Sequence, residues 1–90
     1  MIDDELELDF HGLTFLELKT EGLDQIFEAF RDGFRKFLIV HGYKSGNAIK
    51  NYFKREFAKD FNKFCEKNSK INIEEVANNR GCTRLTIKEL

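Results

Sequence analysis

The hydrophobic pattern changes within residues 36–53, which read KFLIVHGYKSGNAIKNYF. Residues 37–40 form a short continuous apolar run, which is typical of a strand buried on both faces. The second half of the segment has helical spacing, and a polar turn at 41–46 separates the two patterns. A strand, a glycine-containing loop and a helix are therefore predicted. Such a loop leaves its amides and the helix N-terminus available to an anion such as phosphate.

Length and composition indicate one folded domain over residues 1–90. The chain is 41% hydrophobic and contains ten Phe, which favours a packed core over disorder. Two cysteines, Cys65 and Cys82, lie far apart without a C-x-x-C motif, so we expect reduced thiols. No signal peptide or long apolar segment is evident, which predicts a cytoplasmic protein with no membrane partner.

Charge is unevenly distributed along the chain, although the net charge is only −1. Residues 1–34 carry ten acidic and two basic side chains, whereas residues 41–70 carry eight basic and three acidic ones. This asymmetry is compatible with a basic face for nucleic acid. Solvated helix surfaces would produce the same counts, so both interpretations stay open.

The N-terminal part predicts a strand followed by a helix. Residues 5–10 alternate polar and apolar side chains, as a strand does when one face meets the core. Thr14 and Glu17 fit a capping box, so a helix should begin near Phe15. Gly33 is a plausible end of that helix, while Gly22 either weakens it or permits a close approach of another element. One apolar stripe is expected from Leu16, Leu23, Phe27, Phe30 and Phe34.

The C-terminal part predicts a second helix and two strands. The helix should cover about 47–66, with a buried stripe of Ile49, Phe53, Phe57, Phe61 and Phe64. Strands are expected near 70–77 and 82–87, joined by a tight turn at 78–81. The order is strand, helix, strand, helix, strand, strand. We therefore predict an α/β fold, an α+β two-layer sandwich with a four-stranded mixed sheet and two helices.

His11-Gly12 and His41-Gly42 each end a predicted strand and precede a helix. Ligands of open α/β sheets bind at the carboxyl ends of parallel strands. If the two strands are neighbours, about 5 Å apart, both imidazoles and the turn after Gly42 would share one cleft. A lone histidine is more often structural than catalytic. Two at equivalent strand ends strengthen the functional interpretation, and both interpretations stay open at this point.

Three motifs resemble the small MutS-related (Smr) domain. Residues 8–14 (LDFHGLT), with Glu17 after them, resemble its LDxHGxTxxEA opening, and residues 41–46 (HGYKSG), followed by Ala48, resemble its HGxGxG loop. Gly81 and Thr83 resemble the glycine and threonine that begin its last strand. The resemblance implies a βαβαββ fold like the C-terminal domain of translation initiation factor three. It also implies nucleic-acid binding and, in several members, nicking endonuclease activity on DNA or RNA.

The resemblance places the acidic and histidine residues of LDxH on Asp9 and His11, and the second motif on His41, Gly42 and Gly46. The hypothesis is phosphodiester cleavage with His11 as general base or acid, oriented by Asp9. His41 would be a second proton-transfer group or would contact the phosphate. Alternation points Asp9 away from the face of Leu8, so its carboxylate could simply be solvated. A divalent cation such as Mg²⁺ could bind there only with help from substrate phosphates.

Other residues are predicted to bind the phosphate and the rest of the nucleic acid. Phosphate would be held by Gly42, Lys44, Ser45 and Gly46, and further nucleic-acid contacts would come from Lys50, Lys54 and Arg80. Lys44 departs from the family glycine, which places cleavage in doubt more than binding. The alternative is therefore a non-catalytic module that binds structured RNA or the ribosome through the same cleft. A third hypothesis is a protein-interaction domain without nucleic-acid function.

Overall fold

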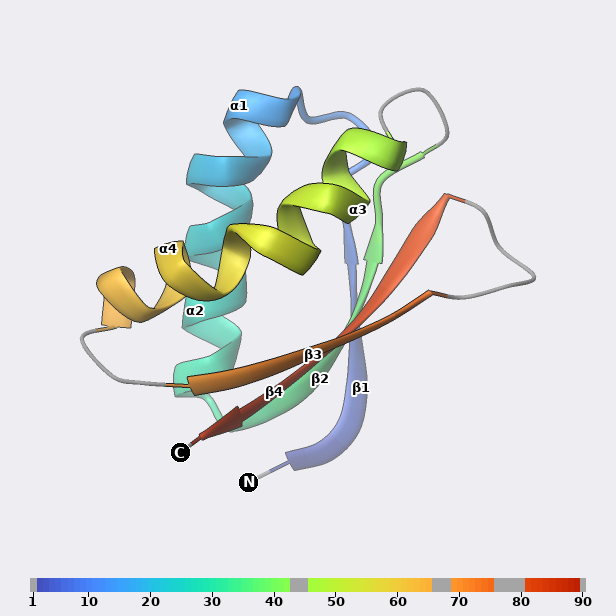
Figure 1. Cartoon of the computed structure of the whole chain (residues 1–90). Helices are drawn as coiled ribbons and strands as arrows, with labels where there is room; N and C mark the ends of the chain where they lie inside the picture. The colour runs from blue at the N-terminus through green and yellow to red at the C-terminus, as the bar shows by residue number, and fades with distance from the viewer. Residues whose placement is uncertain (1, 43–45, 66–68, 76–80, 90) are drawn as a thin grey trace.

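A computed structural model of the chain describes residues 2–42, 46–65, 69–75 and 81–89. In these residues a four-stranded sheet, in the order β1-β2-β4-β3, carries helices on one face (Figure 1). The strands are β1 (Ile2–Asp9), β2 (Phe34–Val40), β3 (Ser69–Glu75) and β4 (Cys82–Glu89). β1 and β2 are parallel, while β4 is antiparallel to both β2 and β3. The predicted mixed sheet and α+β class are confirmed.

The first helical segment begins as the capping box predicts. Thr14 is the N-cap of α1 (Phe15–Glu17). Its Oγ1 accepts a hydrogen bond from the Glu17 amide at 3.1 Å, and its own amide donates to Glu17 Oε1 at 2.9 Å. Hydrogen bonding from Thr14 to the Glu17 carboxylate, from the backbone amide first and then from the side chain, lowers the pKa of that carboxyl. The reciprocal pair satisfies amides that a helix start would otherwise leave unpaired.

A π-helical turn, η1 (Leu18–Gly22), separates α1 from α2 (Leu23–Arg31). Its wider turn rotates the residues before it relative to those after it. Leu16 is therefore 72% exposed, and the prediction that it joins the core stripe was wrong; Leu18 is buried instead. Phe34 was also misplaced, because the helix ends before Gly33, whose φ is 111°, and Phe34 begins β2.

Gly22 allows the close approach that the sequence left as one alternative. A Cβ atom at this position would lie 3.2 Å from Cε2 of Phe10, closer than ordinary van der Waals contact. Phe10 itself is buried directly after β1. The glycine therefore lets the helical segment pack against the residue that precedes His11.

The predicted second helix is divided into α3 (Gly46–Arg55) and α4 (Phe57–Cys65), so the expectation of one helix over 47–66 was wrong in this respect. Hydrogen bonds from the Glu56 amide to the Tyr52 carbonyl and from the Asp60 amide to the Glu56 carbonyl carry the chain through the junction. Tyr52, which the predicted stripe omitted, is buried, whereas Phe64 is partly exposed at the end of α4.

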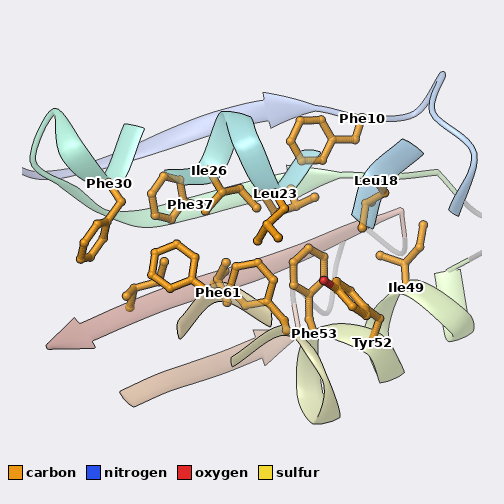
Figure 2. Close-up of a cluster of buried hydrophobic side chains, with 14 of the residues drawn as sticks. Phe10, Leu18, Leu23, Ile26, Phe30, Phe37, Ile49, Tyr52, Phe53 and Phe61 are labelled. Atoms are coloured by element: carbon orange, nitrogen blue, oxygen red, sulfur yellow. The ribbon is translucent and has the colours of Figure 1, made fainter. Parts of the chain in front are cut away.

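The core lies between the helices and one face of the sheet (Figure 2). Phe37 and Ile39 of β2 are fully buried against the helices, whereas Leu38 and Val40 are only partly buried. The expectation that 37–40 is buried on both faces was therefore wrong, because the helices cover only one face. The largest fully buried side chains include Phe10, Leu18, Ile26, Phe37, Ile39, Phe53, Phe57, Phe61, Leu85 and Ile87.

The C-terminal strands pair as a hairpin, as predicted, with Ile71 opposite Ile87. The turn residues 78–80 lie outside the described residues. Among the described helices, none has the length and apolar character that a membrane span requires.

Candidate active site

β1 and β2 bring the two histidine-glycine pairs to the same end of the sheet. Asp9 is paired with Val40 in the parallel register, and the Phe10 amide donates to the Val40 carbonyl at 2.7 Å. The next residues along the two strands are His11 and His41. The neighbouring parallel strands that the sequence analysis required are therefore present.

Asp9 and His11 form a hydrogen-bonded pair at this end. Asp9 Oδ1 accepts from the His11 backbone amide at 3.1 Å and contacts His11 Nδ1. Such a local return from an aspartate side chain to a backbone amide is favoured where a strand turns into a loop. Because a carboxylate can only accept, Nδ1 carries the hydrogen.

The pair is solvent-accessible, with the side chains of His11 and Asp9 exposed by 69% and 56%. The side-chain hydrogen bond from His11, followed by the backbone one, lowers the pKa of Asp9 below its ordinary value of 3.8. Asp9 is therefore a carboxylate at neutral pH. Its solvated position, which alternation predicted, does not prevent it from orienting the imidazole.

His41 is buried, with 6% of its surface exposed. Its Nε2 lies 2.7 Å from Thr83 Oγ1, and its Nδ1 lies 3.0 Å from the Gly42 carbonyl oxygen. Thr83 is 1% exposed, so this contact is shielded from water. His41 and His11 therefore differ in environment: one ring is held inside the protein, and the other is open to solvent.

Gly42 turns the chain out of β2. Its φ of 80° lies in the region that glycine adopts without steric cost. A Cβ atom placed here would lie 3.9 Å from His11 Cβ, so the turn is adjacent to the Asp9–His11 pair. The Gly42 amide, predicted to contact phosphate, donates to the Gly81 carbonyl at 3.0 Å.

The structure describes only some of the other predicted binding residues. Lys44, Ser45 and Arg80 lie outside the described residues. Gly46 is the first residue of α3, and Lys50 lies on the same helix. Lys54 is exposed but falls in the last turn of α3, about 12 Å along the helix axis from Gly46. Lys54 therefore does not lie beside the start of α3, where the loop after Gly42 ends.

Thr83 resembles a threonine of the family but was not predicted as a site residue. A signal for it exists in the sequence. Thr83, Leu85 and Ile87 alternate on one face of β4, and all three are buried. A hydroxyl on the apolar face of a strand requires a hydrogen-bonding partner. That pattern could have pointed to a buried polar contact, although not to His41 as the partner.

Side chains that could bind a metal ion do not cluster among the residues that the structure describes. No three His, Cys, Asp or Glu side chains gather in a way that could hold one. Asp9 offers one carboxylate, and its Oδ1 already accepts from His11. A Mg²⁺ ion prefers six oxygen ligands, so binding here would need water and substrate phosphate oxygens.

The fold and the site define a small α+β domain with an exposed Asp–His pair beside a glycine turn. The family model of the Smr domain matches residues 8–76, which is most of the chain. The chain therefore belongs to the Smr domain family, which is associated with nucleic-acid binding and nicking endonuclease activity. No curated protein and no solved structure matches in the corresponding comparisons.

Proposed function

We propose that this protein is a nucleic-acid-binding Smr domain that nicks DNA or RNA by hydrolysing a phosphodiester bond. The observation that supports this most strongly is the exposed Asp9–His11 pair at the carboxyl end of β1, next to the Gly42 turn. A carboxylate that fixes Nδ1–H of an imidazole leaves the lone pair on Nε2, which can accept a proton.

In the proposed reaction His11 is the general base. Nε2 takes a proton from a water molecule as the water oxygen bonds to phosphorus. The opposite phosphorus–oxygen bond breaks, and the leaving oxygen receives a proton from solvent. Asp9 keeps the ring oriented and stabilises the imidazolium that forms, because its lowered pKa keeps it ionised.

The phosphate would be bound by the loop that links β2 to α3. A helix N-terminus attracts anions through its unpaired amides and its dipole, and α3 begins at Gly46 with no acidic residue in its first turn. Lys44 and Ser45 are proposed to complete this contact. Lys50, Lys54 and Arg80 would neutralise neighbouring phosphates, and Mg²⁺ bound by Asp9 and substrate oxygens would neutralise further charge.

His41 was predicted to transfer a proton or contact phosphate. Its burial and the contacts of its ring with Gly42 and Thr83 favour a positioning role instead. This favours one proton-transfer histidine, His11, at the solvent-accessible end of the site.

The exposure of His11 alone, with His41 buried, also supports a second candidate. This candidate is a module that binds structured RNA or the ribosome without cleaving it. With a single exposed imidazole, binding can persist where cleavage is too slow to matter. Both candidates predict affinity that falls steeply with rising salt, because phosphate contacts release counterions. A protein-interaction domain without nucleic-acid function would lack that dependence.

Cleavage is tested on supercoiled DNA and on a structured RNA, with the wild-type protein, His11→Ala and Asp9→Asn. Gln25→Ala and Asp3→Asn are matched controls, since both residues are exposed and lie on α2 and β1. We expect nicking by the wild type and the controls, and a loss of at least about 100-fold in His11→Ala. Equal cleavage by all five proteins would indicate a contaminating nuclease, and binding without cleavage by the wild type would select the second candidate.

A further inference from the structure

We propose that Thr83 is a positioning residue that fixes His41 as its Nδ1–H tautomer and thereby sets the path of the chain at Gly42. Thr83 lies beyond residues 8–76, which the family model covers. We infer that this turn supports a contact with a nucleic-acid phosphate, and that part of the inference rests on the proposed function.

The tautomer follows from the contacts of the imidazole with Gly42 and Thr83. The Gly42 carbonyl oxygen can only accept, so His41 Nδ1, 3.0 Å away, must carry a hydrogen. In a neutral ring Nε2 is then an acceptor, and Thr83 Oγ1–H, 2.7 Å away, is the donor that it faces. Because both side chains are buried, a water molecule cannot readily replace the hydroxyl.

Both polar backbone groups of Gly42 are thereby engaged. Its carbonyl faces His41 Nδ1, and its amide donates to the Gly81 carbonyl, which also accepts from the His41 amide at 2.7 Å. Gly42, whose φ is 80°, is thus held at its amide by Gly81 and at its carbonyl by His41, which in turn contacts Thr83 of β4.

Packing restricts the same point. A Cβ atom on Gly81 would lie 3.2 Å from the Gly42 Cα and 3.4 Å from its N and C atoms. These are backbone atoms, which cannot move aside as a flexible side chain does. Thr83 and Gly81 therefore act together to hold Gly42. Thr83 acts through the imidazole of His41, and Gly81 acts through direct backbone contact.

The tautomer is read directly from the wild-type protein. A long-range ¹H–¹⁵N correlation spectrum of the imidazoles distinguishes Nδ1–H from Nε2–H rings. We expect Nδ1–H for His41, the less common form of a solvated histidine. An Nε2–H ring would overturn the proposal without reference to any nucleic acid.

The effect on the loop is read from hydrogen exchange of the Gly42 amide. Thr83→Val keeps the shape of the side chain but removes the hydroxyl, and we expect exchange to accelerate about tenfold or more. Thr83→Ser should restore slow exchange, because it retains the donor. Thr86→Val is the matched control, being the same change on the same strand at a position paired with Lys36.

Unchanged exchange in Thr83→Val would also overturn the proposal. If that variant does not fold, the wild-type tautomer and the Thr83→Ser exchange rate decide. Binding of a fluorescently labelled RNA hairpin at low salt is then compared for the same proteins, with a loss of about tenfold expected for Thr83→Val only. Failure of the wild type to bind the hairpin would count against the proposed function, whereas the ligand-free measurements decide the role of Thr83.

Discussion

The Phe10 amide donates a hydrogen bond to the Val40 carbonyl oxygen over 2.7 Å, one residue before each histidine leaves the sheet. This bond sets where the two polar turns begin relative to each other. After this bond the two segments lie in different environments, because the His11 side chain is exposed to solvent and the His41 side chain is buried. One shared backbone contact therefore precedes both an exposed imidazole and a buried one.

The Gly42 turn should be sensitive to any side chain. Gly42→Ala forces a residue with a Cβ atom into a φ of 80°, and we expect the free energy of unfolding to fall by about 1–3 kcal/mol. Nucleic-acid affinity should fall as well. Gly12→Ala is the matched control, since a Cβ atom there meets nothing within 4 Å. Urea denaturation of both variants checks this, and equal losses would contradict a conformational role for Gly42.

Asp9 should make stability depend on pH in the acid range. Its pKa is lowered in the folded protein by the bonds from His11, so its stabilising contribution is present above about pH 3.8 and is lost as pH falls through the folded pKa. Asp9→Asn should remove this part of the pH dependence, while Asp3→Asn should not. Carboxyl NMR titration checks the shift, and His11→Ala should return the Asp9 pKa toward 3.8.

Tyr52 should make stability depend on pH in the alkaline range. Burial, together with the hydrogen bond to Asp60 Oδ2 at 3.0 Å, raises the pKa of the phenol above its ordinary value of 10.0. The neutral form is therefore favoured in the folded state, and stability declines as pH rises above about 10. The chain has two tyrosines. Tyr43→Phe thus isolates Tyr52 for titration by tyrosinate absorbance, and an ordinary midpoint would contradict this assignment.

The π-helical turn predicts opposite results for two leucines two positions apart. Leu18→Ala should lower the free energy of unfolding by about 2–5 kcal/mol, because it leaves a cavity in the core. Leu16→Ala should change it by less than about 0.5 kcal/mol, since that side chain is mostly exposed. Thermal denaturation of both variants makes the comparison, and a large loss at Leu16 would support the regular stripe predicted from the sequence.

The sequence predicted the fold well where local patterns act alone. The capping box at Thr14 and Glu17, the end of the first helix at Gly33 and the C-terminal hairpin all follow from short-range chemistry. The side chain that violates the pattern, Leu16, precedes a π-helical turn that periodicity assumes absent. The break between α3 and α4 at Glu56 could not be predicted in the same way, because no glycine or proline lies there.

The site was predictable in location more than in detail. The predicted ends of two parallel strands indicated that His11 and His41 lie at the same edge of the sheet. The alternation of polar and apolar residues indicated that Asp9 faces solvent. The bonds that separate the roles of the two histidines arise from residues distant in sequence. His41 meets Thr83, 42 positions away, which only the antiparallel pairing of β2 and β4 brings near. No pattern within either segment encodes that contact.

The position of β4 in the chain determines when the contacts around His41 and Gly42 can form. This strand is the last of the four along the chain, yet it fills the interior of the sheet between β2 and β3. A nascent chain that has released both histidines from the ribosome still lacks the Gly81 carbonyl and the Thr83 hydroxyl. The contacts that hold the His41 ring and the Gly42 amide therefore form only after synthesis has reached β4.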